Sequence, residues 1–141
     1  MGNSEFRQIA WDDPIVRDVS YGCGSRSVKD AYAYIRAVAF RNRRWLCEAV
    51  GDFGYYFGYF GKKHFRLVEI AVKSSEHGKG HGTALLKRLV RRCEAEGADR
   101  ITLRCSIEEG NWPFYVRHGF CIVGKKQSDY EMELRTEDYI D

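Results

Sequence analysis

Short apolar and aromatic runs, each bounded by glycine, proline or charged turn residues, recur along the chain and are typical of β-strands. Apolar residues spaced three or four apart predict two longer helices, over residues 27–42 and 82–96. Shorter helices are expected over 15–20 and 111–118, each followed by glycine. The expected strands cover residues 6–10, 45–50, 55–60, 65–72, 100–105, 121–125 and 130–135. Strands followed by alternating strands and helices indicate a mixed α/β layer arrangement.

The helix over 82–96 is the most clearly amphipathic segment. One side is an apolar stripe, formed by Leu85, Leu86, Leu89, Val90 and Cys93. The other side is cationic, with Lys87, Arg88, Arg91 and Arg92. Gly97 follows as a natural stop. This pattern predicts a helix that covers one face of the sheet.

Composition narrows the class of protein. The chain has 141 residues, of which 44% are hydrophobic and 30% charged, so we expect one globular domain over residues 1–141. A polar beginning without a leader pattern, and no apolar run near the ~20 residues of a membrane span, predict a cytoplasmic protein without membrane contact. The five scattered cysteines favour reduced thiols over disulfides or zinc. The net charge of +3 suits a small anionic ligand more than nucleic acid.

A glycine-rich loop between a strand and a helix is the most informative feature of the chain. After the apolar stretch over 68–72, glycine occupies alternate positions at Gly78, Gly80 and Gly82. Glycine lets a ligand approach the backbone and tolerates positive φ, and a helix N-terminus attracts phosphate. A turn with only a structural role is the alternative, but it needs fewer glycines. The pattern therefore predicts a site for a phosphorylated cofactor.

Two motifs make the chain resemble the GNAT N-acetyltransferase superfamily from about residue 44 to 134. The first is His77-Gly78-Lys79-Gly80-His81-Gly82, although His77 stands where the family usually has Arg or Gln. The second is Phe114-Tyr115-Val116-Arg117-His118-Gly119-Phe120, an aromatic-Tyr-x-x-x-Gly-Phe pattern. The resemblance implies a mixed central sheet of six to seven strands, splayed between its two central strands and flanked by about four helices.

The resemblance also implies acetyl-CoA as co-substrate and no metal. The glycine loop would hold the pyrophosphate, and the preceding strand would pair with the pantetheine arm. For the side chains of Lys79 and His81, simple exposure to solvent is an equal alternative. The implied cofactor-binding residues are Ile70, Ala71, Val72, His77, Gly78, Lys79, Gly80, His81, Gly82, Thr83 and Asn111.

Two residues are candidates for acid–base chemistry. Tyr115, by the resemblance, is the general acid that protonates the departing thiolate, and the alternative is a packing tyrosine. Glu69 interrupts an apolar strand, where a charge is costly unless it is paired or used. A catalytic base and a salt-bridged glutamate remain equal alternatives for it. Strict alternation places Glu69 on one face of the strand with Leu67 and Ala71, and we expect His118 on the surface.

These features predict an enzyme that transfers acetyl from acetyl-CoA to a primary amine, in a small molecule or a peptide, by direct attack. The alternative is a catalytically inactive CoA-binding sensor or interaction module on the same fold. A nucleic-acid partner is not expected, since its only support is a basic cluster with a simpler role as a solvated helix end. A homodimer remains an open alternative. The basic cluster consists of Arg36, Arg41, Arg43 and Arg44.

Overall fold

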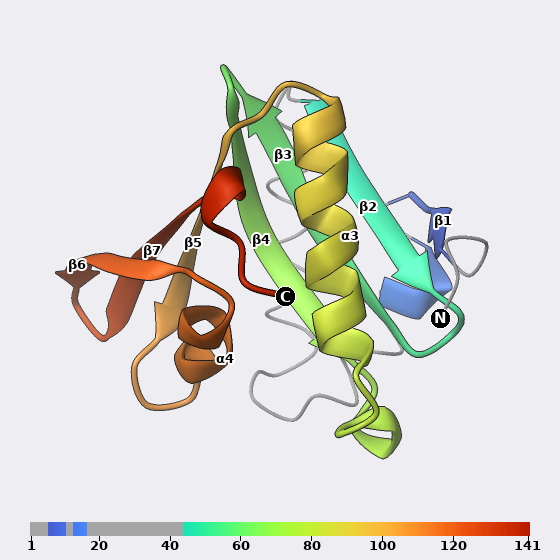
Figure 1. Ribbon diagram of the computed structural model, residues 1–141. Helices are drawn as coiled ribbons and strands as arrows, with labels where there is room; N and C mark the ends of the chain where they lie inside the picture. The colour runs from blue at the N-terminus through green and yellow to red at the C-terminus, as the bar shows by residue number, and fades with distance from the viewer. Residues whose placement is uncertain (1–5, 11–12, 17–43) are drawn as a thin grey trace.

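The computed structural model describes residues 6–10, 13–16 and 44–141. Its strands form one sheet of seven, in the order β1-β2-β3-β4-β5-β7-β6 (Figure 1). Neighbouring strands are antiparallel except β4 and β5, which run parallel. The mixed sheet predicted from the sequence is therefore confirmed. The strands are β1 (Phe6–Gln8), β2 (Arg44–Val50), β3 (Gly54–Gly61), β4 (His64–Val72), β5 (Arg100–Ser106), β6 (Cys121–Lys126) and β7 (Asp129–Arg135).

Helix α3 (His81–Ala95) connects β4 to β5 and lies across β2, β3 and β4, on the same face of the sheet as α4 (Trp112–Arg117) (Figure 1). Two short 3₁₀ turns, η2 (Ser74–Glu76) and η3 (Thr136–Asp138), complete the described elements. Of the two helices expected before β2, only residues 14–16 are described, and they are helical. The helix over 27–42 and three of the four clustered arginines lie outside the described residues. None of the described helices is long and apolar enough to cross a membrane.

The apolar stripe of α3 is buried as predicted and forms the main core with residues of β2, β4, β5, β7 and α4. A second, smaller core lies on the opposite face of the sheet and includes Tyr55, Phe57 and Ala71. None of the described cysteines forms a disulfide, and Cys47, Cys93 and Cys105 are buried.

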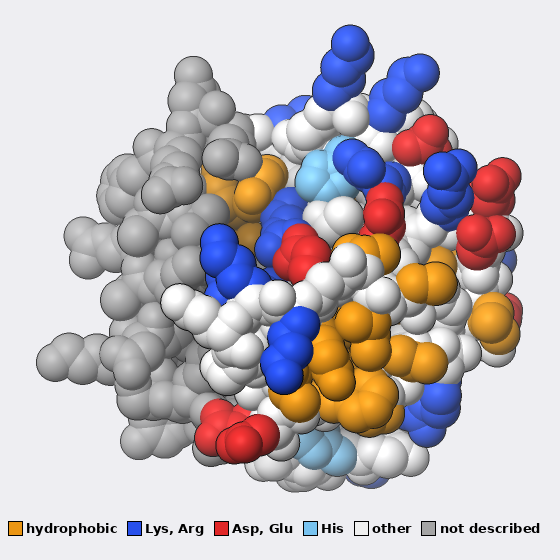
Figure 2. All heavy atoms as spheres, turned by 90° about the vertical axis from the view of Figure 1, so that its left-hand side faces the viewer, with side chains coloured by type: hydrophobic (Ala, Val, Ile, Leu, Met, Phe, Trp, Pro, Cys, Tyr) orange, Lys and Arg blue, Asp and Glu red, His pale blue; other side chains and the backbone are white. Residues whose placement is uncertain are grey.

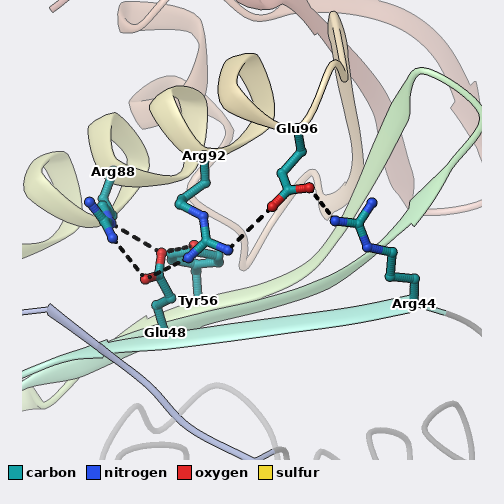
Figure 3. Close-up of polar contacts among 6 residues, drawn as sticks. All are labelled: Arg44, Glu48, Tyr56, Arg88, Arg92 and Glu96. Carbon is teal, nitrogen blue, oxygen red and sulfur yellow. Dashed lines mark hydrogen bonds and ion pairs between the residues drawn. The ribbon is translucent and has the colours of Figure 1, made fainter.

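A buried carboxylate fastens α3 to the sheet. Glu48 on β2 is only 2% exposed and accepts hydrogen bonds from Arg88 (3.2 Å) and Arg92 (3.1 Å) of α3 (Figure 3). The hydroxyl of Tyr56 on β3 donates to the same carboxylate. A buried charge is costly unless it is paired and hydrogen-bonded, and these partners meet that need. The cluster therefore fixes how α3 lies on the sheet, and with it the position of the helix N-terminus.

Strands β4 and β5 separate soon after they meet. Their described pairing covers only residues 64–66 of β4 and 100–102 of β5, although β4 continues to Val72 and β5 to Ser106. The splay implied by the resemblance is therefore present. It opens toward the end of β4 from which the glycine loop leaves.

A β-bulge in β4 breaks the strict alternation that the sequence suggests. Phe57 lies opposite Glu69 and Gly58 opposite Leu67, so Val68 is the extra residue. A Cβ on Gly58 would lie 2.3 Å from the carbonyl oxygen of Arg66, so only glycine allows this close approach. The expectation that Leu67 shares a face with Glu69 is wrong: Leu67 belongs to the main core, while Glu69 faces the second core. Ala71 shares the face of Glu69, as expected.

Strand β6 forms one edge of the sheet and is exposed along its whole length. Its Ile122 and Val123 are among the exposed large apolar residues. Figure 2 views the molecule from this side and shows hydrophobic side chains gathered there. Lys125 and Lys126 end the strand, and charges of this kind discourage edge-to-edge pairing.

Candidate active site

The glycine loop adopts backbone conformations that other residues rarely tolerate. Gly78 has φ +80° and Gly80 has φ +84°. A Cβ built at either position meets nothing within 4 Å. Glycine is therefore required here for conformation, while the space beside the backbone is open to a ligand.

The loop ends at an uncapped helix N-terminus. Gly80 is the N-cap of α3 and provides no side-chain cap, and the first turn contains no acidic residue. The first helical hydrogen bond runs from Ala84 N–H to the Gly80 carbonyl (3.0 Å). The N–H groups of His81, Gly82 and Thr83 thus have no intrahelical acceptor. Together with the helix dipole they form a site suited to an anionic group.

A cleft of about 420 Å³ opens at this N-terminus, between β4, the loop and α4. It brings together nine of the eleven residues predicted to bind the cofactor: Ile70, Val72, His77, Gly78, Gly80, His81, Gly82, Thr83 and Asn111. Ala71 does not line it, because its side chain is buried in the second core. Lys79 does not line it either; its ammonium pairs with Glu76 at 2.6 Å.

Two histidines of the loop have different surroundings. The Nε2 atom of His77 lies 2.7 Å from the carbonyl oxygen of Val72, so its N–H ties the loop back to the end of β4. His81 is only 7% exposed and stacks on Phe53 at 4.7 Å. Its Nδ1 atom is buried without a hydrogen-bond partner. Since His81 lines the cleft, a ligand could supply the missing partner.

Three further residues that were not predicted from the sequence to bind the cofactor also line the cleft: Glu76, Phe114 and Arg117. Arg117 lies 6.0 Å from the ring centre of Phe114, and it places a positive charge on the α4 side. The signal was available, because Asn111, Phe114 and Arg117 follow at intervals of three on a predicted helix. Glu76 carries a negative charge, and its hydrogen bond with Lys79 holds the pKa of the Glu76 carboxyl below its ordinary value.

Tyr115 lies beneath the cleft rather than in its lining. Its ring is 7% exposed and packs against Phe114 and Phe120. Burial raises the pKa of Tyr115, and negative charge on Cys105 and Glu69 raises it further. The phenol therefore keeps its proton at neutral pH. It is a packing residue that also carries a proton it can donate.

Glu69 is half-buried on the face of the sheet opposite α3, where the hydroxyl of Tyr55 donates a hydrogen bond to its Oε2 at 2.7 Å. His118 differs from the expectation of a surface residue. It is 9% exposed, its Nδ1 lies 2.8 Å from the Ile140 carbonyl oxygen, and its Nε2 lies 3.4 Å from the Thr83 hydroxyl. It thereby joins α4 to α3 and to the C-terminal segment.

Solved structures of acetyltransferases share this fold at low sequence identity. The PaiA N-acetyltransferase of Thermoplasma acidophilum, solved in complex with coenzyme A, is 17% identical, with a TM-score of 0.75 over 93% of this chain and 98% of that one. The ribosomal-protein-S18-alanine N-acetyltransferase of Escherichia coli is 17% identical, with a TM-score of 0.75 over 93% and 92%. An aminoglycoside 6′-N-acetyltransferase, complexed with coenzyme A, is 16% identical, with a TM-score of 0.73 over 93% and 96%.

Among curated proteins, no sequence matches this chain at a significant level. The model of the acetyltransferase (GNAT) family, however, matches residues 5–120, which is most of the chain. The matched segment contains β4, the glycine loop, α3, α4 and the cleft between them. Acetyl-CoA is the co-substrate of acetyltransferases of this kind. The chain belongs to the GNAT acetyltransferase family.

Proposed function

We propose that this protein transfers the acetyl group of acetyl-CoA directly to a primary amine, without an acetylated enzyme intermediate. The observation that carries the proposal is the cleft, which extends from the uncapped N-terminus of α3 along Ile70 and Val72 of β4 to Asn111 of α4. It combines an anion site with a channel beside the splayed strands. That combination suits a long ligand with a pyrophosphate at one end.

Acetyl-CoA supplies an acyl thioester. The backbone N–H groups of the loop and of the first turn of α3 bind the pyrophosphate, and the unpartnered Nδ1 of His81 supports a further ligand contact here. Backbone groups of Ile70, Ala71 and Val72, beyond the described pairing of β4 with β5, and the amide of Asn111 hold the pantetheine arm. A backbone N–H near Val72 stabilises the carbonyl oxygen as it becomes negative.

Glu69 is the proposed general base. The acceptor arrives mainly as an ammonium ion, and its nitrogen must lose a proton before its electron pair can form the new C–N bond. A half-buried carboxylate attracts that cation and accepts the proton, directly or through water. Glu69 also acts electrostatically on the other proposed catalytic group: after burial and Cys105, its charge raises the pKa of Tyr115.

Tyr115 is the proposed general acid. When the C–N bond has formed, the C–S bond breaks and the sulfur leaves with its electron pair. The phenol of Tyr115, kept protonated by burial, donates its proton to that sulfur. The nitrogen loses two protons on its way from ammonium to amide. Glu69 accepts the first before attack, and the second, lost from the nitrogen after the C–N bond has formed, returns to the Tyr115 phenolate, so that the products are an amide, a thiol and the proton held by Glu69.

The acceptor class follows from the same chemistry. Neighbours of the same fold are named for amine acceptors, one an aminoglycoside and one the alanine of a ribosomal protein. These names support either a small-molecule or a peptide amine for this chain.

The direct test is amine-dependent release of CoA thiol from acetyl-CoA, with product mass measured for n-butylamine, kanamycin and a peptide that begins with alanine. Wild type is expected to acetylate at least one of them. Glu69→Gln is expected to lower the rate by about 100-fold or more, while Glu94→Gln, an exposed position on α3, keeps the wild-type rate. Binding of acetyl-CoA without transfer to any amine would contradict the proposal and favour the sensor alternative.

A further inference from the structure

Tyr55 makes a contact that the proposed reaction does not yet use. We propose that Tyr55 is a positioning residue, which orients the Glu69 carboxylate and keeps it ionised for its work as base. The inference rests on the proposed function, because Glu69 is its target. Tyr55 itself touches no reacting atom.

The geometry of the contact is specific. The Tyr55 hydroxyl lies 2.7 Å from Glu69 Oε2, and the ring is fully buried in the second core. Tyr55 on β3 lies opposite Ala71, whereas Phe57 lies opposite Glu69. The tyrosine ring therefore reaches diagonally across the strand pair to the carboxylate. A buried ring has little rotational freedom, so its hydroxyl holds Glu69 in one orientation.

The bulge in β4 lies directly before Glu69. Beyond it, regular pairing of residues 54–57 with 69–72 places Glu69 on the face of Tyr55 and Ala71. Before it, Leu67 faces the main core, so the bulge lets one strand turn Leu67 toward α3 and Glu69 toward Tyr55. Gly58, which allows the close approach of β3 and β4 at this point, is therefore part of the same arrangement.

The titratable groups around Glu69 come from several elements. Tyr55 contacts it from β3, and the charge of Glu69 raises the pKa of Cys47 on β2 and of Tyr115 on α4. Asp13 acts on Cys47 as well. Cys47 and Tyr115 are neutral at working pH because burial raises their pKa values. A hydrogen bond donated to the ionised carboxylate favours that form, and Tyr55 donates such a bond.

The next residue along β3 provides a natural control. Tyr56 is also fully buried, and its hydroxyl also donates to a carboxylate, but on the other face of the sheet, where Glu48 is held by Arg88 and Arg92 (Figure 3). Removal of either hydroxyl costs a buried hydrogen bond. Of these two hydroxyls, that of Tyr55 is the one that contacts the proposed base. The pair Tyr55→Phe and Tyr56→Phe thus separates positioning from stability.

The first experiment follows the Glu69 carboxyl carbon by ¹³C NMR in Glu-labelled protein as pH is varied, with the signal assigned by its loss in Glu69→Gln. In Tyr55→Phe the titration midpoint is expected about one pH unit higher, and in Tyr56→Phe it stays at the wild-type value. An unchanged midpoint in Tyr55→Phe would overturn the inference, whatever the activity. This readout requires no acceptor.

The second readout is the pH dependence of kcat with n-butylamine. In Tyr55→Phe the acid limb of the profile is expected to shift by about one unit to higher pH. At pH values below the limb kcat is then about tenfold lower than in wild type, and at higher pH it returns to the wild-type value. Full activity of Glu69→Gln would reject the proposed base, even if the NMR midpoint moves. If Glu69→Gln removes the acid limb but Tyr55→Phe does not shift it, the role of Tyr55 is rejected and the role of Glu69 as base stands.

A further variant covers the case in which Tyr55→Phe does not fold. In Glu69→Asp the side chain is shorter by one methylene group, so the carboxylate lies farther from the Tyr55 hydroxyl; its carboxyl carbon is followed in Asp-labelled protein. Aspartate is intrinsically the stronger acid, by about 0.4 pH unit, so its own chemistry would move the midpoint downward. Loss of the Tyr55 hydrogen bond predicts an upward movement, and a downward one would overturn the inference.

Discussion

At the scale of single residues, Tyr115 combines a packing position in the core with its proposed role as general acid. Its ring packs between Phe114 and Phe120, and its burial keeps the phenol protonated. Removing only the oxygen leaves the packing in place. The proposed acid role can therefore be separated from the structural one.

We predict that Tyr115→Phe lowers kcat by about 100-fold and changes the Kd for acetyl-CoA less than about twofold, because Tyr115 is absent from the cleft lining. Calorimetry and initial rates measure the two quantities. An equal loss of turnover and affinity would show that the hydroxyl serves binding or folding instead.

Among the described residues that line the cleft, Glu76 is the one with an acidic side chain. The negative charge of Glu76 repels an anionic ligand. The ammonium of Lys79 pairs with this carboxylate and offsets its charge. We predict that Glu76→Gln tightens acetyl-CoA binding by about two- to fivefold at low salt, because it removes a negative charge from the cleft; the effect is modest because Lys79 is exposed and solvent screens the pair. Glu94→Gln, with the same charge change on the exposed side of α3, is the control. Weaker binding in Glu76→Gln would mean that the loop conformation depends on the Glu76–Lys79 pair.

At the scale of elements, the sequence predicted correctly those features that follow from the spacing of residues along the chain. The stripe of α3 and the glycines at Gly78 and Gly80 follow from spacing along the chain, and both predictions agree with the structure. The bulge at Val68 arises from how β3 and β4 pair, and the pairing of Lys79 with Glu76 from how the loop folds. Neither feature can be predicted from the periodicity of the sequence. For this reason the prediction that Leu67 shares a face of β4 with Glu69 was wrong.

The bulge leads to a stability prediction. A methyl group at Gly58 would meet the Arg66 carbonyl oxygen at 2.3 Å and the Phe65 ring at 2.5 Å. We expect Gly58→Ala to lower the free energy of unfolding by about 1–3 kcal/mol, measured by urea denaturation. Gly61→Ala at the end of the same strand, where the nearest atom is 3.5 Å away, should change it by less than about 0.5 kcal/mol. Equal effects would contradict the described register.

At the scale of the whole molecule, two helices and a separated strand pair place the site. The Glu48 cluster fixes α3 on β2 and β3, and the gap between β4 and β5 leaves room between α3 and α4. The cleft therefore depends on the sheet as a unit. Stability of the core and integrity of the site should be linked.

The core also contains acids that are held neutral. Burial raises the pKa of Cys93 to about 12 and raises the pKa values of Cys47, Tyr56 and Tyr115. In the unfolded chain these groups ionise near about pH 8.5 for thiols and 10 for phenols. Their stabilising contribution is thus complete below about pH 8 and is lost as pH rises toward the folded-state values.

We therefore predict that the free energy of unfolding falls between pH 8 and pH 10, by up to about 1.4 kcal/mol per pH unit for each thiol. Urea denaturation at several pH values measures this. Cys93→Ala should be less stable at pH 7 and should show a shallower decline, since one titrating group is gone. The same slope in both proteins would contradict the assignment.

The central claim, that the N-terminus of α3 and its loop hold acetyl-CoA, is tested most directly by calorimetric titration of acetyl-CoA into wild type, Gly80→Asp and Gly97→Asp. Gly80 and Gly97 lie at opposite ends of α3, with φ +84° and +80°, and a Cβ at either meets nothing within 4 Å. The backbone strain of the two substitutions is therefore matched. We predict that binding is lost in Gly80→Asp and retained in Gly97→Asp. Equal binding by both variants, or none by wild type, would contradict the account.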